Sequence, residues 1–188
     1  MSHGAPTVLV LPGYGDSGPA HWQSLWQAKH PEYRRVQQKD WENPARADWV
    51  DALGALVDER IGHPVIVLGH SMGTIIGLEA WARWPERIRA AIFVGGVPQV
   101  APHIRERLSD RVRALAGATD LGGWGKRVSP GVFAASTFGA RPEVVAAFER
   151  LFEMQSVEAY VRCCMILLSA NAEAIVPTLS GPCLAITG

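Results

Sequence analysis

The chain has 188 residues, of which 48% are hydrophobic, so it is long enough for one domain with a substantial core. Its 18 Lys and Arg residues balance its 18 Asp and Glu residues. This balance excludes the strong electrostatic attraction that draws basic proteins to nucleic acid or to an anionic membrane. We therefore expect a small-molecule or protein partner, with no nucleic acid and no membrane.

The N-terminus and the cysteines indicate a reducing compartment. The segment MSHGAPTVLVLPG has no basic stretch, and its apolar run of about six residues is too short for a signal peptide or a membrane span. Cys163 and Cys164 are adjacent, where a mutual disulfide would be strained, and Cys183 is left over. We expect a cytoplasmic protein with reduced, buried thiols.

Five short apolar runs have the pattern of strands buried in a parallel sheet. The first is Thr7–Leu11 (TVLVL), which Pro12 and Gly13 close. The others are 34–38, 64–69, 89–94 and 177–188. Of these, 34–38 is weak and 64–69 is the most regular. The first four strands alternate with the expected helices 19–29, 48–61 and 74–84, which predicts a doubly wound parallel α/β sheet.

After residue 96 the alternation stops. The segment 97–174 is mostly helical, with helices expected over 104–116, 142–154 and 157–168 and no convincing strand between them. We interpret it as a helical cap inserted over the carboxyl edge of the sheet. The predicted division is therefore a core over 1–96, a cap over 97–174 and a last core strand within 175–188.

The sequence Gly69-His70-Ser71-Met72-Gly73 matches the pattern G-x-S-x-G of a nucleophile elbow. A strand precedes it and a helix follows it, which is the context that the motif requires. Both glycines are expected to be needed, because a side chain at either would collide with backbone in so tight a turn. The turn would raise the Ser71 hydroxyl above the sheet as a candidate nucleophile. A glycine-rich helix start that serves packing alone is the alternative.

Two backbone donors could stabilise the oxyanion that forms when a serine attacks a carbonyl group. The N–H of Met72 lies at the start of the helix, where the helix dipole also favours negative charge. The second candidate is the N–H of Tyr14, in the loop after the first strand. That loop could also be only a tight turn. It has neither the third glycine of a dinucleotide fingerprint nor the Gly-Lys-Ser/Thr of a phosphate-binding loop.

These motifs resemble those of the α/β-hydrolase superfamily along essentially the whole chain. The stretches LPGYGDSGPAHWQSLW and VQQKDWENP are similar to small serine hydrolases of the retinoblastoma-binding protein 9 and YdeN type. The stretches WPERIRAAIFVGG and VPTLSGPCLAITG resemble capped esterases and enol-lactonases. The resemblance implies an α/β-hydrolase fold and esterase or lactonase activity on an acyl or ester substrate. It also implies an acyl-enzyme on Ser71 and no metal or organic cofactor.

A serine nucleophile needs a histidine to take its proton and an acid to orient that histidine, in the chain order serine, acid, histidine. After Ser71 the only histidine is His103, and the acids between them, Glu79 and Glu86, lie on or just after the elbow helix. The resemblance places the acid after GGVPQV or after PCLAITG, and neither position offers one. We therefore expect that about 60–80 further residues carry the acid and histidine beyond Gly188. The 188 residues alone would then show little or no turnover.

Two other interpretations stay open. A non-catalytic module with a degenerate hydrolase fold would bind its ligand under the cap. Alternatively, a second chain would supply the acid and histidine by strand exchange at the last strand. Four more histidines, His21, His30, His63 and His70, are expected to be structural or solvated because none follows the required order.

Overall fold

The computed structural model describes residues 7–12, 14–41, 43, 45–59 and 65–187. Within these residues five parallel strands form one sheet in the order β2-β1-β3-β4-β5. The strands are β1 (Thr7–Leu11), β2 (Arg34–Arg35), β3 (Val65–His70), β4 (Ile88–Val94) and β5 (Cys183–Ile186). The predicted parallel α/β sheet is confirmed.

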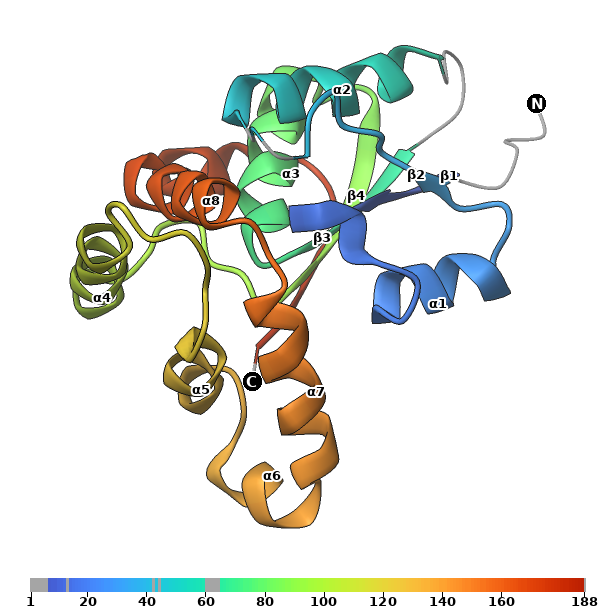
Figure 1. Cartoon of the computed structure of the whole chain (residues 1–188). Helices are drawn as coiled ribbons and strands as arrows, with labels where there is room; N and C mark the ends of the chain where they lie inside the picture. Colours follow the sequence, from blue (N-terminus) through green and yellow to red (C-terminus); the bar gives the residue numbers. More distant parts are fainter. Residues whose placement is uncertain (1–6, 13, 42, 44, 60–64, 188) are drawn as a thin grey trace.

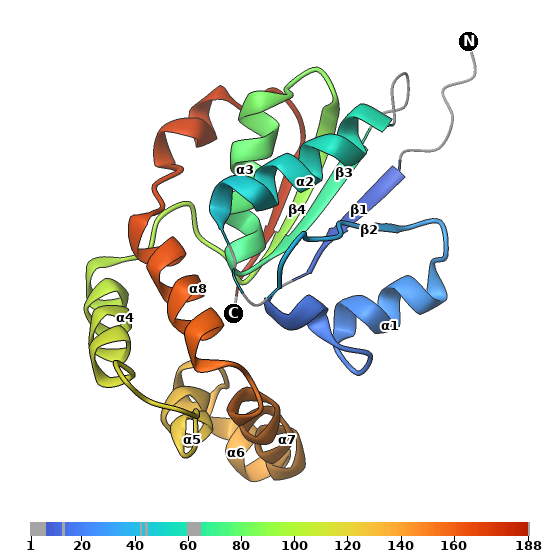
Figure 2. The same cartoon turned by 45° about the horizontal axis from the view of Figure 1, so that its top comes forward.

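Helices cover both faces of the sheet. Figure 1 and Figure 2 show α2 (Arg46–Glu59) and α3 (Met72–Arg83) on one face and α1 (Trp22–Lys29) on the other. The central strands β1 and β3 are apolar on both faces because both faces are covered. Their buried side chains form the middle of the core together with those of α2 and α3, including Leu9, Leu53, Val65, Val67, Ile76 and Trp81.

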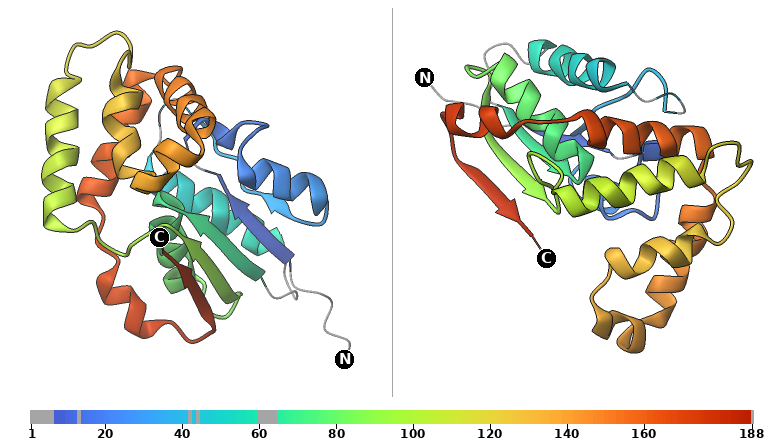
Figure 3. Two further views of the ribbon diagram at one scale, coloured as in Figure 1. Left: turned by 90° about the horizontal axis from the view of Figure 1, so that it is seen from below. Right: turned by 90° about the vertical axis from the view of Figure 1, so that its left-hand side faces the viewer.

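The segment after β4 is helical, as predicted, and lies beyond the carboxyl ends of the strands (Figure 3). It contains α4 (Pro102–Ala114), α5 (Trp124–Val128), α6 (Ala135–Ala140), α7 (Pro142–Glu153) and α8 (Val157–Ser169), followed by the 3-10 helix η3 (Glu173–Thr178). Its two ends meet, because the Ala172 N–H donates to the Pro98 carbonyl at 2.9 Å and Gln99 pairs with Asn171.

The helical segment is attached to the main core through its last helix. Ile166 on α8 and Ala172 after it belong to the same buried cluster as the sheet. A second, smaller cluster joins α4 to α8 through Val100, Leu108 and Cys164. The helix α8 also contacts η1 (Tyr14–Ser17), the 3-10 helix that follows β1. The segment therefore borders the loop that the sequence predicts to carry an oxyanion donor.

The last strand is shorter and more exposed than the strand predicted over 177–188. The strand β5 has four residues, and all are exposed, with exposed fractions of 54% for Leu184 and 47% for Ile186. The expectation of a buried strand is therefore wrong. Since β5 lies at the edge of the sheet and pairs only with β4 among the described strands, water reaches it. Residues 177–178 belong to η3, so the chain becomes extended only after Gly181 and Pro182.

The three thiols are free, but only one is fully buried. Cys164 is buried and Cys163 is partly buried, whereas Cys183 on β5 is exposed, which corrects the expectation for that residue. Burial, together with the neighbouring Cys164, raises the pKa of Cys163 to about 12. A thiol with so high a pKa is not the thiolate that a cysteine nucleophile requires.

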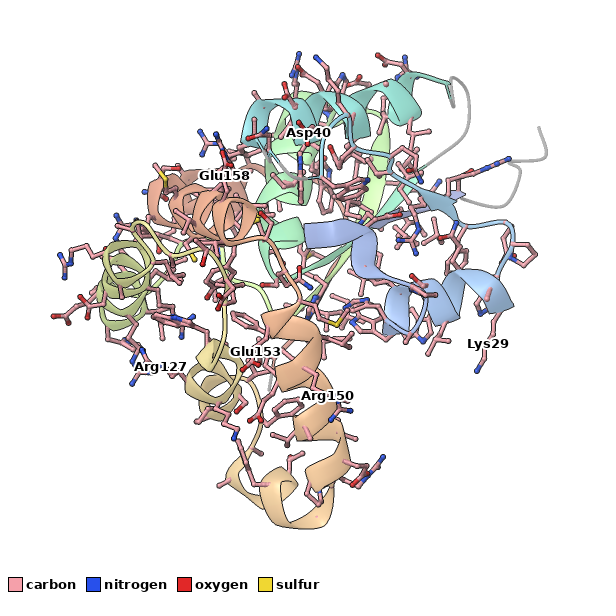
Figure 4. All side chains as sticks on the ribbon, viewed as in Figure 1. Lys29, Asp40, Arg127, Arg150, Glu153 and Glu158 are labelled. Atoms are coloured by element: carbon pink, nitrogen blue, oxygen red, sulfur yellow. The ribbon has the colours of Figure 1, made fainter. Side chains whose placement is uncertain are left out.

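Charged side chains lie on the outside of the helices. Figure 4 shows Lys29, Arg127, Arg150 and Glu158 pointing away from the sheet and into solvent. Of the helices that the structure describes, none combines the length and the apolar character needed to cross a membrane.

Candidate active site

Ser71 occupies a sharp turn between β3 and α3. Its backbone has φ 53° and ψ −118°, in the region that favours glycine. Two hydrogen bonds fix the turn: the Ser71 N–H donates to the Val94 carbonyl at 2.9 Å, and the Thr74 N–H donates to the Ser71 carbonyl at 2.9 Å. The side chain is exposed. A strained conformation of this kind costs about 1–3 kcal/mol and persists where the surrounding structure fixes it.

The glycines around the turn differ in how much room they have. A Cβ at Gly69 would lie 2.5 Å from the Gly73 carbonyl oxygen, so Gly69 is required. A Cβ at Gly73 would lie 3.7 Å from its nearest neighbour, the side chain and carbonyl of Leu11, so the expected collision at Gly73 is wrong. The reason is that Gly73 faces the end of β1 rather than its own turn.

The second crowded glycine is Gly96, just after β4. A Cβ there would overlap Thr74 Oγ1 and would lie 2.9 Å from the Ser71 carbonyl oxygen. The pattern G-x-S-x-G does not include this residue. The only signal in the sequence is that the pair Gly95-Gly96 ends the strand next to the elbow strand.

The two candidate oxyanion donors lie just after the ends of two neighbouring strands, β3 and β1. Met72 is the first residue of α3, directly after Ser71. Tyr14 is the first residue of η1, three positions after the end of β1. Leu11 at the end of β1 pairs with Gly69 on β3, so both loops start at the same edge of the sheet. Of the loop 12–15, Gly13 lies outside the described residues.

Two histidines lie beside the elbow and both have structural contacts. The ring of His70 meets Trp22 edge to face at 5.5 Å between centroids, and it lies 6.0 Å from the ring of His21. The Nδ1 of His21 accepts the Gln23 N–H at 3.3 Å and caps the start of α1. A neutral His21 ring then carries its proton on Nε2 and has no free acceptor for the proton of a serine.

Of the remaining histidines, the structure describes His30 and His103, and neither is hydrogen-bonded to Ser71. His30 pairs with Glu32 at 3.2 Å at the end of α1. His103 lies in the first turn of α4 and is exposed. His63 lies outside the described residues. His21, His30 and His70 were expected to be structural or solvated, and each makes one of the ring or polar contacts given above.

Acid is expected to destabilise the fold through His21. Burial, the neighbouring His70 and then Arg35 lower the pKa of His21 from 6.5 to about 4. Between these values the unfolded chain binds a proton that the folded chain rejects, so stability is lost as the pH falls from about 6.5 to about 4. The loss attributable to His21 should be about 1–2 kcal/mol after allowing for solvent screening of a partly exposed ring.

Denaturant unfolding of the parent and of His21→Asn between pH 7.5 and pH 4 measures this loss. Asparagine is also a good helix N-cap but does not titrate. The difference in unfolding free energy between the two chains should therefore change over this pH range. A constant difference would contradict the lowered pKa of His21.

The acids that follow Ser71, Glu79 on the elbow helix and Glu86 just after it, lie beside arginines. Glu79 pairs with Arg46 at 3.2 Å, and Glu86 lies 3.8 Å from Arg87. Among the described residues, no histidine or carboxylate is hydrogen-bonded or ion-paired to Ser71. The same residues contain no group of three His, Cys, Asp or Glu side chains placed to hold a metal ion.

The chain is similar to known hydrolases. The sequence model of the family described as serine hydrolase matches residues 8–118. RutD of Klebsiella pneumoniae (strain 342), a proposed carbamate hydrolase, is 32% identical over 123 residues, 60% of this chain and 46% of that protein. The chain thus matches less than half the length of this curated relative.

Solved structures share the fold. A thermophilic esterase from Thermogutta terrifontis aligns with a TM-score of 0.74 at 16% identity, over 96% of this chain and 70% of its own. MGS-M2, an α/β hydrolase from a Medee basin deep-sea metagenome library, aligns with a TM-score of 0.74 at 13% identity, over 98% of this chain and 72% of its own. At such identities these structures establish the fold alone.

Proposed function

The chain belongs to the serine hydrolase family and has the α/β-hydrolase fold, and on that premise we propose that Ser71 is the nucleophile of an ester or acyl hydrolase. The observation that carries the proposal is the backbone of Ser71, held at φ 53° between β3 and α3 with an exposed side chain. A packing turn has no need of this strain, whereas a nucleophile gains an exposed hydroxyl from it.

The proposed chemistry is an acyl transfer in two steps. Ser71 Oγ attacks the carbonyl carbon and loses its proton to a base, while the carbonyl π electrons move to oxygen. The N–H groups of Met72 and Tyr14 stabilise the resulting oxyanion. Collapse of this intermediate breaks the bond to the leaving oxygen, which takes up the proton from the base and departs as the alcohol, and water then hydrolyses the acyl-enzyme by the same route and restores the Ser71 hydroxyl.

The proposed substrate is a small, uncharged carboxylic ester or lactone. Carbamates, the proposed substrates of RutD, share with esters the carbonyl carbon that a serine attacks. We propose that the helical segment 97–174 is the cap that shapes the acyl pocket and excludes water. A run of aromatic contacts through this segment supports an apolar pocket: Phe133 meets Phe148 at 5.3 Å, Phe148 meets Phe152 at 5.9 Å, and Phe152 meets Tyr160 at 4.9 Å.

The 188 residues alone are proposed to turn over slowly, because Ser71 has no bound base among the described residues. General-base assistance typically contributes about 10²–10⁴-fold to the rate. Water would have to take the proton instead. Acylation of Ser71 should therefore proceed, but far below the rate of a complete triad.

Added imidazole tests both parts of the proposal. Release of 4-nitrophenolate from 4-nitrophenyl acetate is followed for the parent chain and for Ser71→Ala, and the difference is the Ser71-dependent rate. This difference should be small in buffer and rise at least about tenfold with neutral imidazole, which supplies the base. Equal rates for both chains at every imidazole concentration would contradict Ser71 as nucleophile. A fast Ser71-dependent rate without imidazole would contradict the missing base.

A non-catalytic binding module is the second candidate, favoured because no base within the described residues is hydrogen-bonded to Ser71. It predicts that the chain binds an ester without ever forming a bond to Ser71. Intact mass spectrometry after incubation with 4-nitrophenyl acetate and imidazole separates the two functions. An added acetyl group that Ser71→Ala lacks supports the hydrolase, and an unchanged mass supports the binding module.

A further inference from the structure

The loop between β1 and α1 is held by two polar side chains, a buried glutamine and a partly buried arginine, that the mechanism above does not use. We infer that Gln23 and Arg35 are positioning residues that fix the backbone of this loop, and with it the Tyr14 N–H, relative to the elbow. The inference rests on the proposed function, because that loop is the proposed source of the second oxyanion donor.

Gln23 on α1 ties the two ends of the loop together. Its side chain is fully buried, with an exposed fraction of 0%. Its Nε2 donates to the Leu11 carbonyl at 2.7 Å, and its Oε1 accepts from Ser17 Oγ at 2.8 Å. A buried amide is costly unless its groups are paired, and here its partners are the residue that ends β1 and the residue that ends η1. Gln23 therefore fixes the distance between the end of β1 and the end of η1.

Arg35 on β2 holds the same loop from the other side. Its Nη1 donates to the Asp16 carbonyl at 2.7 Å and to Asp16 Oδ1 at 3.0 Å. Its Nη2 donates to Ser24 Oγ at 2.7 Å, and that hydroxyl donates to the Ser17 carbonyl at 2.5 Å. Its Nε donates to Gln27 Oε1 at 2.7 Å. The fixed fork of the guanidinium thus sets Asp16, Ser24 and Gln27 in one arrangement.

These bonds hold a backbone that would otherwise relax. Asp16 has φ 60° and Ser17 has φ 47°, both in the region that favours glycine. Such strained backbone conformations persist only where the surrounding structure fixes them. Without Gln23 and Arg35 the loop is expected to sample other conformations.

The tethers also fix the loop relative to Ser71. Leu11, whose carbonyl accepts from Gln23, pairs with Gly69 and lies beside Gly73 of the elbow. Leu11, at the start of the loop, is thus in contact with both helix α1 and the elbow. A displacement of about 1 Å in an oxyanion donor is enough to lose much of its effect, which is commonly about 10²–10³ in rate.

The test compares Gln23→Leu with Gln37→Leu, the same substitution at an exposed residue beside β2. Ser24→Ala is a gentler second variant that cuts the link from Arg35 to the Ser17 carbonyl without leaving an unpaired buried amide. Two quantities are measured for each chain: the rate at which a fluorophosphonate labels Ser71, and amide hydrogen exchange over the loop, β3 and α3.

Gln23→Leu should slow labelling of Ser71 at least tenfold and speed exchange over residues 14–17 while β3 keeps its protection. Ser24→Ala should change both quantities in the same direction but less, and Gln37→Leu should change neither. Faster loop exchange with labelling at the parent rate overturns the inference. So does faster exchange spread evenly over the sheet, since that reports global destabilisation. A parent chain that is never labelled at Ser71 contradicts the proposed function instead, and loop exchange then still decides whether Gln23 holds the loop.

Discussion

Gly69→Ala is expected to destabilise the chain by about 3 kcal/mol or more, whereas Gly73→Ala should leave stability within about 1 kcal/mol of the parent. The alanine Cβ at Gly69 would lie 2.5 Å from the Gly73 oxygen and 2.7 Å from its carbonyl carbon. These are backbone atoms of the first turn of α3, so they can move only if the elbow opens. At Gly73 the added methyl group makes ordinary contacts at 3.7 Å, and alanine favours the helix.

Urea unfolding of the three chains at pH 7.5 measures the difference. Both substitutions add one methyl group within the same five-residue motif, so Gly73→Ala controls for composition and for proximity to Ser71. Similar losses in both variants would contradict the asymmetric elbow that the structure shows. The parent pattern G-x-S-x-G would then need both glycines, as the sequence alone suggested.

Regular elements were predictable wherever apolar periodicity was strong. The strand Thr7–Leu11 matches its prediction, β3 differs from its prediction by one residue at each end, and β4 differs by one residue at its start. The helices α4, α7 and α8 were also expected close to where they lie. The short helices α5 and α6 were not expected, since five or six residues with a glycine show no helical period. The exposure of β5 depends on what covers an edge strand, which a sequence pattern does not reveal.

The elbow was predictable because its residues are contiguous in the chain. Ser71 and Met72 lie where the motif places them, and Tyr14 lies in the loop expected to face them. Gly96 and Gln23 were not identified as parts of the site. Each acts through a contact with a distant stretch of sequence: Gly96 with Thr74 on α3, and Gln23 with Leu11 at the end of β1. Only the packing of the sheet brings these residues together.

Replacing Ser71 by alanine is expected to have the largest effect on chemistry. The variant lacks the only atom proposed to bond to substrate, so labelling at this position should fall to the level of the untreated chain. The fold should be unaffected, since the Ser71 hydroxyl is exposed and the turn is fixed by backbone bonds to Val94 and Thr74. Serine and alanine both have a Cβ, so the substitution adds no strain at this positive φ, and equal unfolding free energies of the two chains check that the fold is kept.

The most direct test of Ser71 as the nucleophile is to incubate the 188-residue chain with a fluorophosphonate. Intact and peptide mass spectrometry then locate the adduct. We expect one adduct, on Ser71, which forms slowly in buffer and faster with imidazole, and which Ser71→Ala does not form. An adduct on another residue, or equal labelling of the parent and Ser71→Ala, would contradict it.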